Sequence, residues 1–184
     1  MRSTLSRVTW IQRTAVRCAN VDRRWAHALH RVSAWPAVMA TLRVVSWLGD
    51  GPIWYATMAG LPILLGWSGW PCTLQMLSVG GINLLIYLCL KHGIGRPRPY
   101  VSCPDIRACA RALDRFSFPS GHTLHAVAYA IIISHHYPSF ALPLWVFAAL
   151  VSASRVVLGL HYPSDVLAGG AVGGMIAEVV LAWP

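Results

Sequence analysis

The hydrophobic pattern of the chain consists of five long apolar stretches that follow a more polar N-terminal region. They cover residues 53–70, 73–90, 121–136, 140–158 and 163–183. A helix that crosses a membrane needs about 20 mainly apolar residues, which these stretches reach or approach. The connection between the first two is so short that we expect an antiparallel hairpin. The pattern predicts an all-α fold, an integral membrane helical bundle of about five transmembrane helices.

The N-terminal region shows a different pattern, in which basic and apolar residues are interleaved. Residues 1–34 contain seven arginines among apolar residues such as Trp10 and Trp25. This composition is typical of amphipathic helices that lie on a membrane surface. Residues 35–48 are apolar but too short to cross a bilayer, and we expect that helix to end at a turn capped by Asp50. The region therefore predicts interfacial helices.

Composition supports a membrane protein. The chain is 56% hydrophobic and 11% charged, with a mean hydropathy of +0.54, whereas about 25% of residues in soluble domains are charged. The formal net charge is +9, and such a balance fits nucleic acid, anionic lipid headgroups or a phosphorylated substrate. Nucleic-acid binding is disfavoured, because the arginines follow a membrane face and no known recognition fold is visible.

The chain divides into a basic interfacial segment, residues 1–50, and a transmembrane core, residues 51–184. Five crossings place the N-terminal segment, the polar loop 91–120 and the turn 159–164 on one face, together with all fifteen Lys and Arg residues. Because cytoplasmic loops are enriched in Lys and Arg, this face is predicted to be cytoplasmic. We expect an integral protein of a bacterial inner membrane.

Three polar segments at helix ends on the charged face contain the candidate chemistry. They read KHGIGRPRP at residues 91–99, PSGH at residues 119–122 and SRVVLGLHYPSD at residues 154–165. Together they resemble the signature motifs of the type 2 phosphatidic acid phosphatase (lipid phosphate phosphatase) family, over roughly residues 50–180. The resemblance implies a phosphatase core with loop 91–120 as its catalytic loop, and the spacing of the first motif selects Arg98 over Arg96.

The residue types in these motifs suit a phosphate group. Phosphoryl transfer needs several fixed positive donors around the phosphate oxygens, and Lys91, Arg98 and Arg155 are the candidate donors. Ser120 and the backbone N–H of Gly121 open a predicted helix, where amides and the helix dipole favour an anion. These five residues are the predicted substrate phosphate-binding site.

Two histidines are the candidate catalytic groups. Asp165 lies four residues after His161, so its carboxylate can orient one ring nitrogen and leave the other free as a nucleophile. The resemblance implies that His161 attacks phosphorus to form a phosphohistidine and that His122 protonates the departing oxygen and then activates water. The sequence offers no acidic cluster and no zinc-type cysteine spacing, so neither a metal nor another cofactor is expected.

Several alternatives remain open at this point. The substrate could be phosphatidylglycerophosphate, phosphatidate or a polyprenyl phosphate, or undecaprenyl pyrophosphate if the site faces outward. The same phosphohistidine could serve a lipid phosphotransferase, a haloperoxidase shares these motifs, and a non-catalytic lipid-binding scaffold would need only the anion site. Besides the phosphorylated lipid and membrane lipids no partner is implied, and the oligomeric state is open. Cys103 and Cys109 could pair if their loop faced an oxidising compartment.

Overall fold

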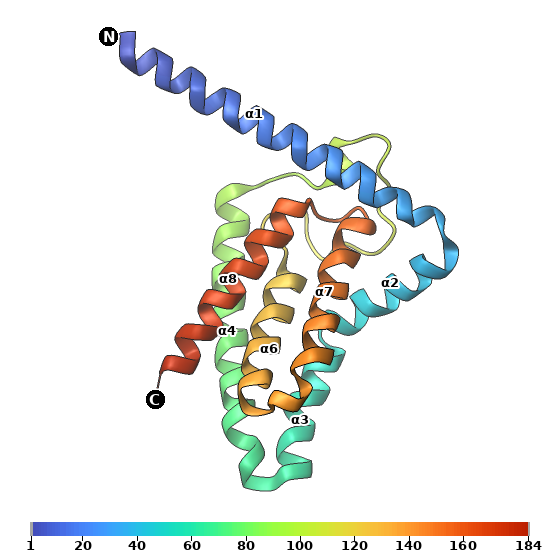
Figure 1. Ribbon diagram of the computed structural model, residues 1–184, viewed down its shortest axis with the longest axis vertical. Coiled ribbons are helices and arrows are strands. Elements are labelled where there is room, and N and C mark those ends of the chain that lie inside the picture. Colours follow the sequence, from blue (N-terminus) through green and yellow to red (C-terminus); the bar gives the residue numbers. More distant parts are fainter. Residues whose placement is uncertain (1, 184) are drawn as a thin grey trace.

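The structure, a computed structural model, is built from helices joined by tight turns and one long loop (Figure 1). It describes residues 2–183, apart from the side chains of residues 2–9, 11 and 15, so the side chains of Arg2 and Arg7 lie outside the described part. The helices are α1 (Arg2–His30), α2 (Pro36–Gly49), α3 (Pro52–Leu65), α4 (Trp70–Ile94), α5 (Pro99–Ser102), α6 (Gly121–His136), α7 (Ala141–Val157) and α8 (Pro163–Ala182). Short 3₁₀ turns, η1 (Arg31–Ala34), η2 (Gly66–Gly69) and η3 (Pro138–Phe140), join some of them.

Three described stretches are long and apolar enough to cross a membrane, namely Pro52–Ile94, Pro138–Val157 and Pro163–Ala182. The first folds back on itself at η2, so that α3 and α4 form the expected antiparallel hairpin (Figure 1). With 16 residues, α6 is shorter than a usual membrane-crossing helix. The prediction of an all-helical integral membrane bundle is confirmed.

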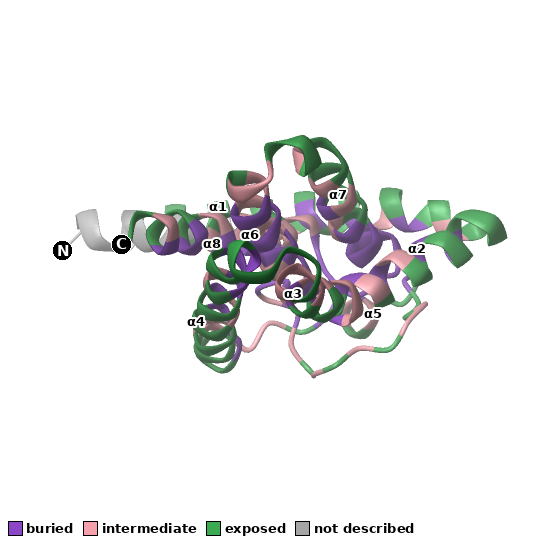
Figure 2. Cartoon of the chain, turned by 90° about the horizontal axis from the view of Figure 1, so that it is seen from below, coloured by how far each residue is buried: buried purple, intermediate pink, exposed green. Residues whose placement is uncertain are grey.

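The bundle surrounds α6, which is its most buried helix (Figure 2). Residues such as Leu124 and Ile132 on α6 are fully enclosed. By contrast, Leu64, Leu85 and Leu142 on the surrounding helices are largely exposed. A bundle with an apolar interior and an equally apolar outer surface is suited to a bilayer, because lipid tails cover the outward leucines.

Two glycines let α8 lie directly against α6. A Cβ atom at Gly173 would lie 2.1 Å from the backbone oxygen of Leu124, and one at Gly169 would lie 2.6 Å from that of Ser120. Small residues spaced four apart allow close helix contact inside membranes, where packing rather than water exclusion drives association. This contact fixes the start of α6 relative to the start of α8.

The N-terminal helix lies across the polar end of the bundle instead of standing apart from it. In Figure 1, α1 passes over the ends of α7 and α8, and it contacts both. His30 holds it there, since its Nδ1 donates a hydrogen bond to the Val157 carbonyl (2.9 Å) and its Nε2 accepts one from the Arg107 N–H (3.3 Å). Trp10 and Trp25 remain exposed on this helix.

The packing of α8 on α6 generates a stability prediction. Gly173→Ala should destabilise the fold by about 2–3 kcal/mol, because the added methyl group meets rigid backbone and overpacking cannot be relieved by a rotamer change. Gly174→Ala is the matched control, since its Cβ would make only ordinary contact, 3.7 Å from Ile131. Thermal unfolding in detergent should show a lower Tm for Gly173→Ala alone; equal Tm values for the two variants would contradict the packing described here.

Candidate active site

The three motif segments meet at one end of the bundle, under the long loop between α5 and α6 (Figure 1). Lys91 lies in the last turn of α4, and Arg155 lies in the last turn of α7. His122 is in the first turn of α6, and His161 is in the turn between α7 and α8. Residues that are far apart in the sequence therefore reach a single site at the end of the bundle.

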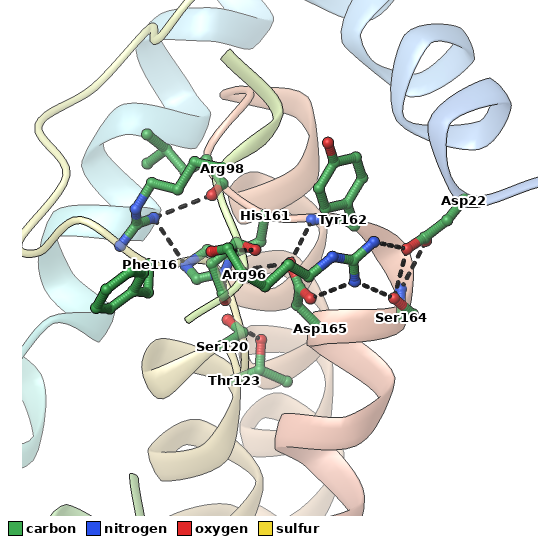
Figure 3. A network of polar contacts seen from close by, with 12 residues as sticks. Asp22, Arg96, Arg98, Phe116, Ser120, Thr123, His161, Tyr162, Ser164 and Asp165 are labelled. Atoms are coloured by element: carbon green, nitrogen blue, oxygen red, sulfur yellow. Dashed lines mark hydrogen bonds and ion pairs between the residues drawn. The ribbon is translucent and has the colours of Figure 1, made fainter. Parts of the chain in front are cut away.

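The His161 ring is fully buried and its tautomer is fixed by its neighbours (Figure 3). Nδ1 donates to the Ser117 carbonyl oxygen at 2.6 Å, and because a carbonyl can only accept, Nδ1 must bear the proton. Nε2 is then unprotonated, and its lone pair accepts a hydrogen bond from Arg98 Nη1 at 3.2 Å. This is the form of imidazole that can act as a nucleophile.

The charged neighbours of His161 also favour its neutral form. Burial lowers the pKa of His161 well below its ordinary value, and the positive charges of Arg155, Arg98 and Lys91 together with His122 lower it further. The same list of neighbours shows that the two histidines and the three cations form one electrostatic cluster. The charges that act on His161 thus come from all three motif segments.

Asp165 is placed differently from the expectation. Its carboxylate lies 3.8 Å from His161 Nδ1, beyond hydrogen-bond distance. One oxygen accepts the Tyr162 N–H at 2.8 Å, and the other accepts Arg96 Nη1 at 2.7 Å (Figure 3). Asp165 thus fixes the turn that contains His161 and adds a negative charge behind the ring, while the Ser117 carbonyl orients the ring directly.

The predicted phosphate-binding cations are buried, and an acid from the loop pairs with two of them. Lys91 is 3% exposed, Arg98 1% and Arg155 2%. Asp114 accepts hydrogen bonds from Lys91 Nζ at 2.6 Å and from Arg98 Nη2 at 2.9 Å. Tyr87 donates its hydroxyl hydrogen to the same carboxylate. Asp114 therefore satisfies donors that a bound anion would otherwise engage.

These contacts decide the charge state of Asp114. Burial alone would raise its pKa, but the hydrogen bonds from Lys91 and Tyr87 and the nearby Arg98 hold the pKa of this carboxyl below its ordinary value. The side chain of Asp114 is 28% exposed, whereas those of Lys91 and Arg98 are 4% and 1% exposed. Asp114 is an internal counter-ion for the cation cluster.

Arg155 has unused hydrogen-bonding capacity. Its Nη1 donates to the Ser46 hydroxyl at 2.6 Å, while its buried Nε has no hydrogen-bond partner among the described residues. A buried donor without an acceptor is costly, and an oxygen of a bound anion would satisfy it. This is independent support for an anion site next to Arg155.

The start of α6 brings Ser120 and Gly121 to the same end of the bundle. Ser120 is fully buried and exchanges a hydrogen bond with the Thr123 hydroxyl at 3.0 Å (Figure 3). Gly121 packs so tightly on the Tyr87 ring that a Cβ atom would lie 2.7 Å from it. A side chain at position 121 would therefore force the Tyr87 ring to move.

A cavity of about 380 Å³ opens beside His122 and is lined largely by apolar residues and glycines. His122 Nε2 lies 3.2 Å from Asp50, which also lines the cavity. Asp50 is the residue after α2, so its expected capping position is confirmed, and its contact with His122 is an additional feature.

Arg96 belongs to a second charged network next to the His161 turn (Figure 3). It donates to Asp165 and to Asp22 of α1, and its guanidinium lies 4.0 Å from the centre of the Tyr162 ring. Asp22 also accepts the Ser164 N–H at 3.0 Å. Two opposite charges hold the pKa of Arg96 above its ordinary value although burial opposes this. Arg96 thus supports the turn and does not reach the Lys91 cluster.

Two further features bear on expectations from the sequence. Cys103 and Cys109 are both free thiols in the structure, and Cys103 is buried beside the Tyr162 hydroxyl. Within residues 2–183, no group of three or more His, Cys, Asp or Glu side chains is arranged to hold a metal ion.

Sequence reasoning missed Asp114, Tyr87, Ser117 and Asp22 as parts of this site. Asp114 had a weak signal, since it is one of two acids in a mainly basic loop. Tyr87 lies one helical turn before Lys91 and could have been proposed from that spacing. Ser117 contributes a backbone carbonyl, which leaves no trace in residue type, and Asp22 comes from a distant helix.

The fold defines an integral membrane protein in which three buried cations lie around a buried histidine. The chain belongs to the PAP2 superfamily, whose family model matches residues 72–184. It is a lipid phosphate phosphatase of that superfamily, whose members act without a metal ion. The resemblance inferred from the three motifs is thereby confirmed.

Individual relatives agree with this assignment. The chain is 30% identical over 171 residues to the decaprenylphosphoryl-5-phosphoribose phosphatase of Mycobacterium tuberculosis, covering 90% of this chain and 85% of that one. It is 36% identical over 125 residues to phosphatidylglycerophosphatase B of Bacillus subtilis, covering 62% and 57%. The solved PAP2-type phosphatidylglycerolphosphate phosphatase of B. subtilis superimposes with a TM-score of 0.73 at 27% identity, covering 90% of this chain and 85% of that one.

The contacts of Asp114 generate a prediction. Asp114→Ala should lower the free energy of unfolding by about 2 kcal/mol, because it leaves the buried Lys91 unpaired. For a chain of this size the Tm should fall by roughly 5 °C.

Inorganic phosphate or vanadate should raise the Tm of this variant more than that of the unmodified protein, since the anion replaces the missing carboxylate. Asp105→Ala, an exposed acid of the same loop, is the control. Equal stabilisation of both proteins by phosphate would refute the counter-ion role.

Proposed function

We propose that the protein hydrolyses a phosphomonoester or pyrophosphate of a membrane lipid with His161 as the nucleophile. The observation that supports this most directly is the hydrogen bond from His161 Nδ1 to the Ser117 carbonyl. It leaves Nε2 unprotonated next to Arg98, within the cation cluster. A neutral imidazole that is aimed at a phosphate-binding site can attack phosphorus without prior loss of a proton.

In the first step, His161 Nε2 forms a bond to phosphorus while the bond from phosphorus to the ester oxygen breaks. His122 gives its proton to that oxygen, so the lipid leaves as an alcohol and not as an alkoxide. In the second step His122 takes a proton from water, whose oxygen attacks the phosphohistidine and releases inorganic phosphate. Asp165 would stabilise the positive charge that develops on the His161 ring during both steps.

Lys91, Arg98 and Arg155, with Ser120 and the Gly121 N–H, would hold the phosphate oxygens during these steps. Buried positive donors stabilise the charge that spreads over these oxygens in the transition state. The unpartnered Nε of Arg155 supports this role, as does the ability of Lys91 and Arg98 to bind the Asp114 carboxylate. No metal ion is required, because the fixed cations supply the neutralising charge.

The cavity beside His122 supports a lipid as the leaving group. It is mostly apolar and reaches Met58 and Leu77 in the α3–α4 hairpin, so it can receive the part of the lipid next to the phosphate. The relatives act, by their names, on decaprenylphosphoryl-5-phosphoribose and on phosphatidylglycerophosphate. We therefore propose a lipid phosphomonoester of the polyprenyl or phospholipid type, with phosphatidate and undecaprenyl pyrophosphate as the other candidates to test.

We propose that α3, α4, α6, α7 and α8 each cross the membrane, with residues 1–50 lying on its surface and residues 51–184 forming the phosphatase core. The exposed tryptophans and arginines of α1 support the surface position. The site then lies on the face that contains the basic residues, which the positive-inside rule assigns to the cytoplasm of a bacterial inner membrane.

His161→Ala tests the nucleophile. This variant should lower phosphate release by more than about 1,000-fold, because no covalent intermediate can form. His135→Ala, an exposed histidine at the other end of α6, should keep full activity. Phosphate release should be measured on purified protein with phosphatidylglycerophosphate, phosphatidate, a polyprenyl-linked phosphoribose phosphate and undecaprenyl pyrophosphate. Equal release by the unmodified protein and His161→Ala would end the proposal.

The same assay separates hydrolysis from phosphotransfer. With an excess of a second lipid alcohol and a labelled phosphate donor, a hydrolase gives labelled inorganic phosphate. A lipid phosphotransferase gives a labelled second lipid instead, and that result would replace hydrolysis with transfer while leaving His161 as the nucleophile.

Cysteine labelling tests the orientation. Cys18 is exposed on α1 at the charged end, and Trp67 is 89% exposed at the opposite end of the bundle. With the site in the cytoplasm, a membrane-impermeant maleimide added to intact cells should not label the unmodified protein at Cys18. It should label a protein that combines Cys18→Ser with Trp67→Cys. The opposite pattern would place the site outside and favour a substrate on the outer face.

A further inference from the structure

Asp50 is the acid nearest the second catalytic histidine. Its Oδ1 lies 3.2 Å from His122 Nε2. The turn that holds Asp50 is well fixed, since Trp54 Nε1 donates to the Gly49 carbonyl at 3.0 Å and Gly49 lies tightly against Val151. The position of this carboxylate therefore follows from the packing of α2 and α3 and does not depend on a flexible loop.

The charges around His122 explain why a contact with Asp50 matters for proton transfer. The ionisable groups that act most strongly on His122 are Arg155, His125, Arg98 and Lys91, all cationic or neutral. Such surroundings oppose a positive charge on the ring. A general acid must nevertheless have a proton to give, so a carboxylate on the ring is the feature that can keep it there.

The position of the pair agrees with a role at the leaving group. Asp50 and His122 both line the apolar cavity beside the site, whereas the nucleophile His161 does not line it and is fully buried. A phosphate between the two histidines would direct its lipid oxygen toward the cavity. The proton on His122 is needed on that side.

We propose that Asp50 is a positioning residue that accepts a hydrogen bond from His122 Nε2 and so favours the protonated ring, whose second proton, on Nδ1, is given to the lipid oxygen. This inference rests on the proposed function, because it assumes that His122 is the general acid. As the ester bond breaks, the proton moves from His122 Nδ1 to the departing oxygen, while Nε2 stays bonded to Asp50, which remains a carboxylate. When water attacks phosphorus and the bond to His161 Nε2 breaks, the proton of the water returns to His122 Nδ1.

The test compares two leaving groups on one lipid-like tail. An alkyl phosphate leaves as a poor alkoxide and needs a proton, whereas a nitrophenyl phosphate with the same alkyl chain leaves as a stable phenolate. The measured quantity is kcat/KM, which reports the steps up to departure of the leaving group and not the hydrolysis of the phosphohistidine. Asp50→Asn should lower kcat/KM for the alkyl phosphate by about 100-fold, within the range of a lost general acid, but for the nitrophenyl phosphate by less than about fivefold.

Control variants separate this role from a structural one. His122→Gln should also lower kcat/KM for the alkyl phosphate much more than for the nitrophenyl phosphate. Adding Asp50→Asn to His122→Gln should cause no further loss, because each change removes the same proton donation to the leaving group. Asp50→Glu should restore part of the alkyl phosphate activity. Asp105→Asn, in which an exposed loop acid is changed, should leave both substrates unaffected.

Two outcomes would overturn the inference. If Asp50→Asn lowers kcat/KM equally for both substrates, Asp50 acts only through folding or phosphate binding; if it lowers neither, the contact has no catalytic role. Phosphate-induced stabilisation in a melting assay verifies that Asp50→Asn is folded, and if it is not, the comparison is made with Asp50→Glu and His122→Gln. A fully active His161→Ala would instead remove the proposed function itself, so the two failures can be told apart.

Discussion

The burial of three permanent cations at the edge of the membrane bundle is the constraint on which the site depends. Lys91, Arg98 and Arg155 are almost completely enclosed, and a buried charge is tolerated only when it is paired or hydrogen-bonded. In the structure Asp114 compensates for two of them, while one donor of Arg155 remains unpartnered. The cluster thus contains more positive charge than Asp114 alone compensates, which is the property that the proposed phosphate-binding role uses.

The same positive field acts on both histidines in one direction but has different consequences for their proposed roles. It keeps His161 neutral, which suits a nucleophile, and it also opposes protonation of His122, which does not suit an acid. In the proposed mechanism, Asp50 offsets the effect of these cations on His122 through a direct contact. Among the described residues, no carboxylate lies within hydrogen-bond distance of the His161 ring. Two imidazoles in one electrostatic environment can thus be given different proposed roles by their local contacts.

The sequence predicted the helices and the motif residues well because both depend on local signals. Apolar length defined the bundle, and the limits of α6 agreed with the predicted stretch. The partners of the motif residues could not be predicted in the same way. The acceptor for His161 is a backbone carbonyl at Ser117, and Asp165 turned to the Tyr162 N–H, because a carboxylate at the third position of a helix caps its start more directly than it reaches a preceding ring. Such choices depend on how the loop folds, which residue types alone do not determine.

The N-terminal segment is tied to the catalytic turn by charge. Asp22 of α1 binds Arg96 and the backbone N–H of Ser164, and Arg96 binds Asp165, whose other oxygen fixes Tyr162 directly after His161. A helix that lies on the membrane surface is therefore continuous, through ion pairs and hydrogen bonds, with the turn that presents the nucleophile. Because each of these groups is at least partly buried, the contacts are screened less than surface ion pairs. The basic segment and the core are thus best understood as one structural unit, in which the depth of α1 at the bilayer surface and the position of His161 are set together.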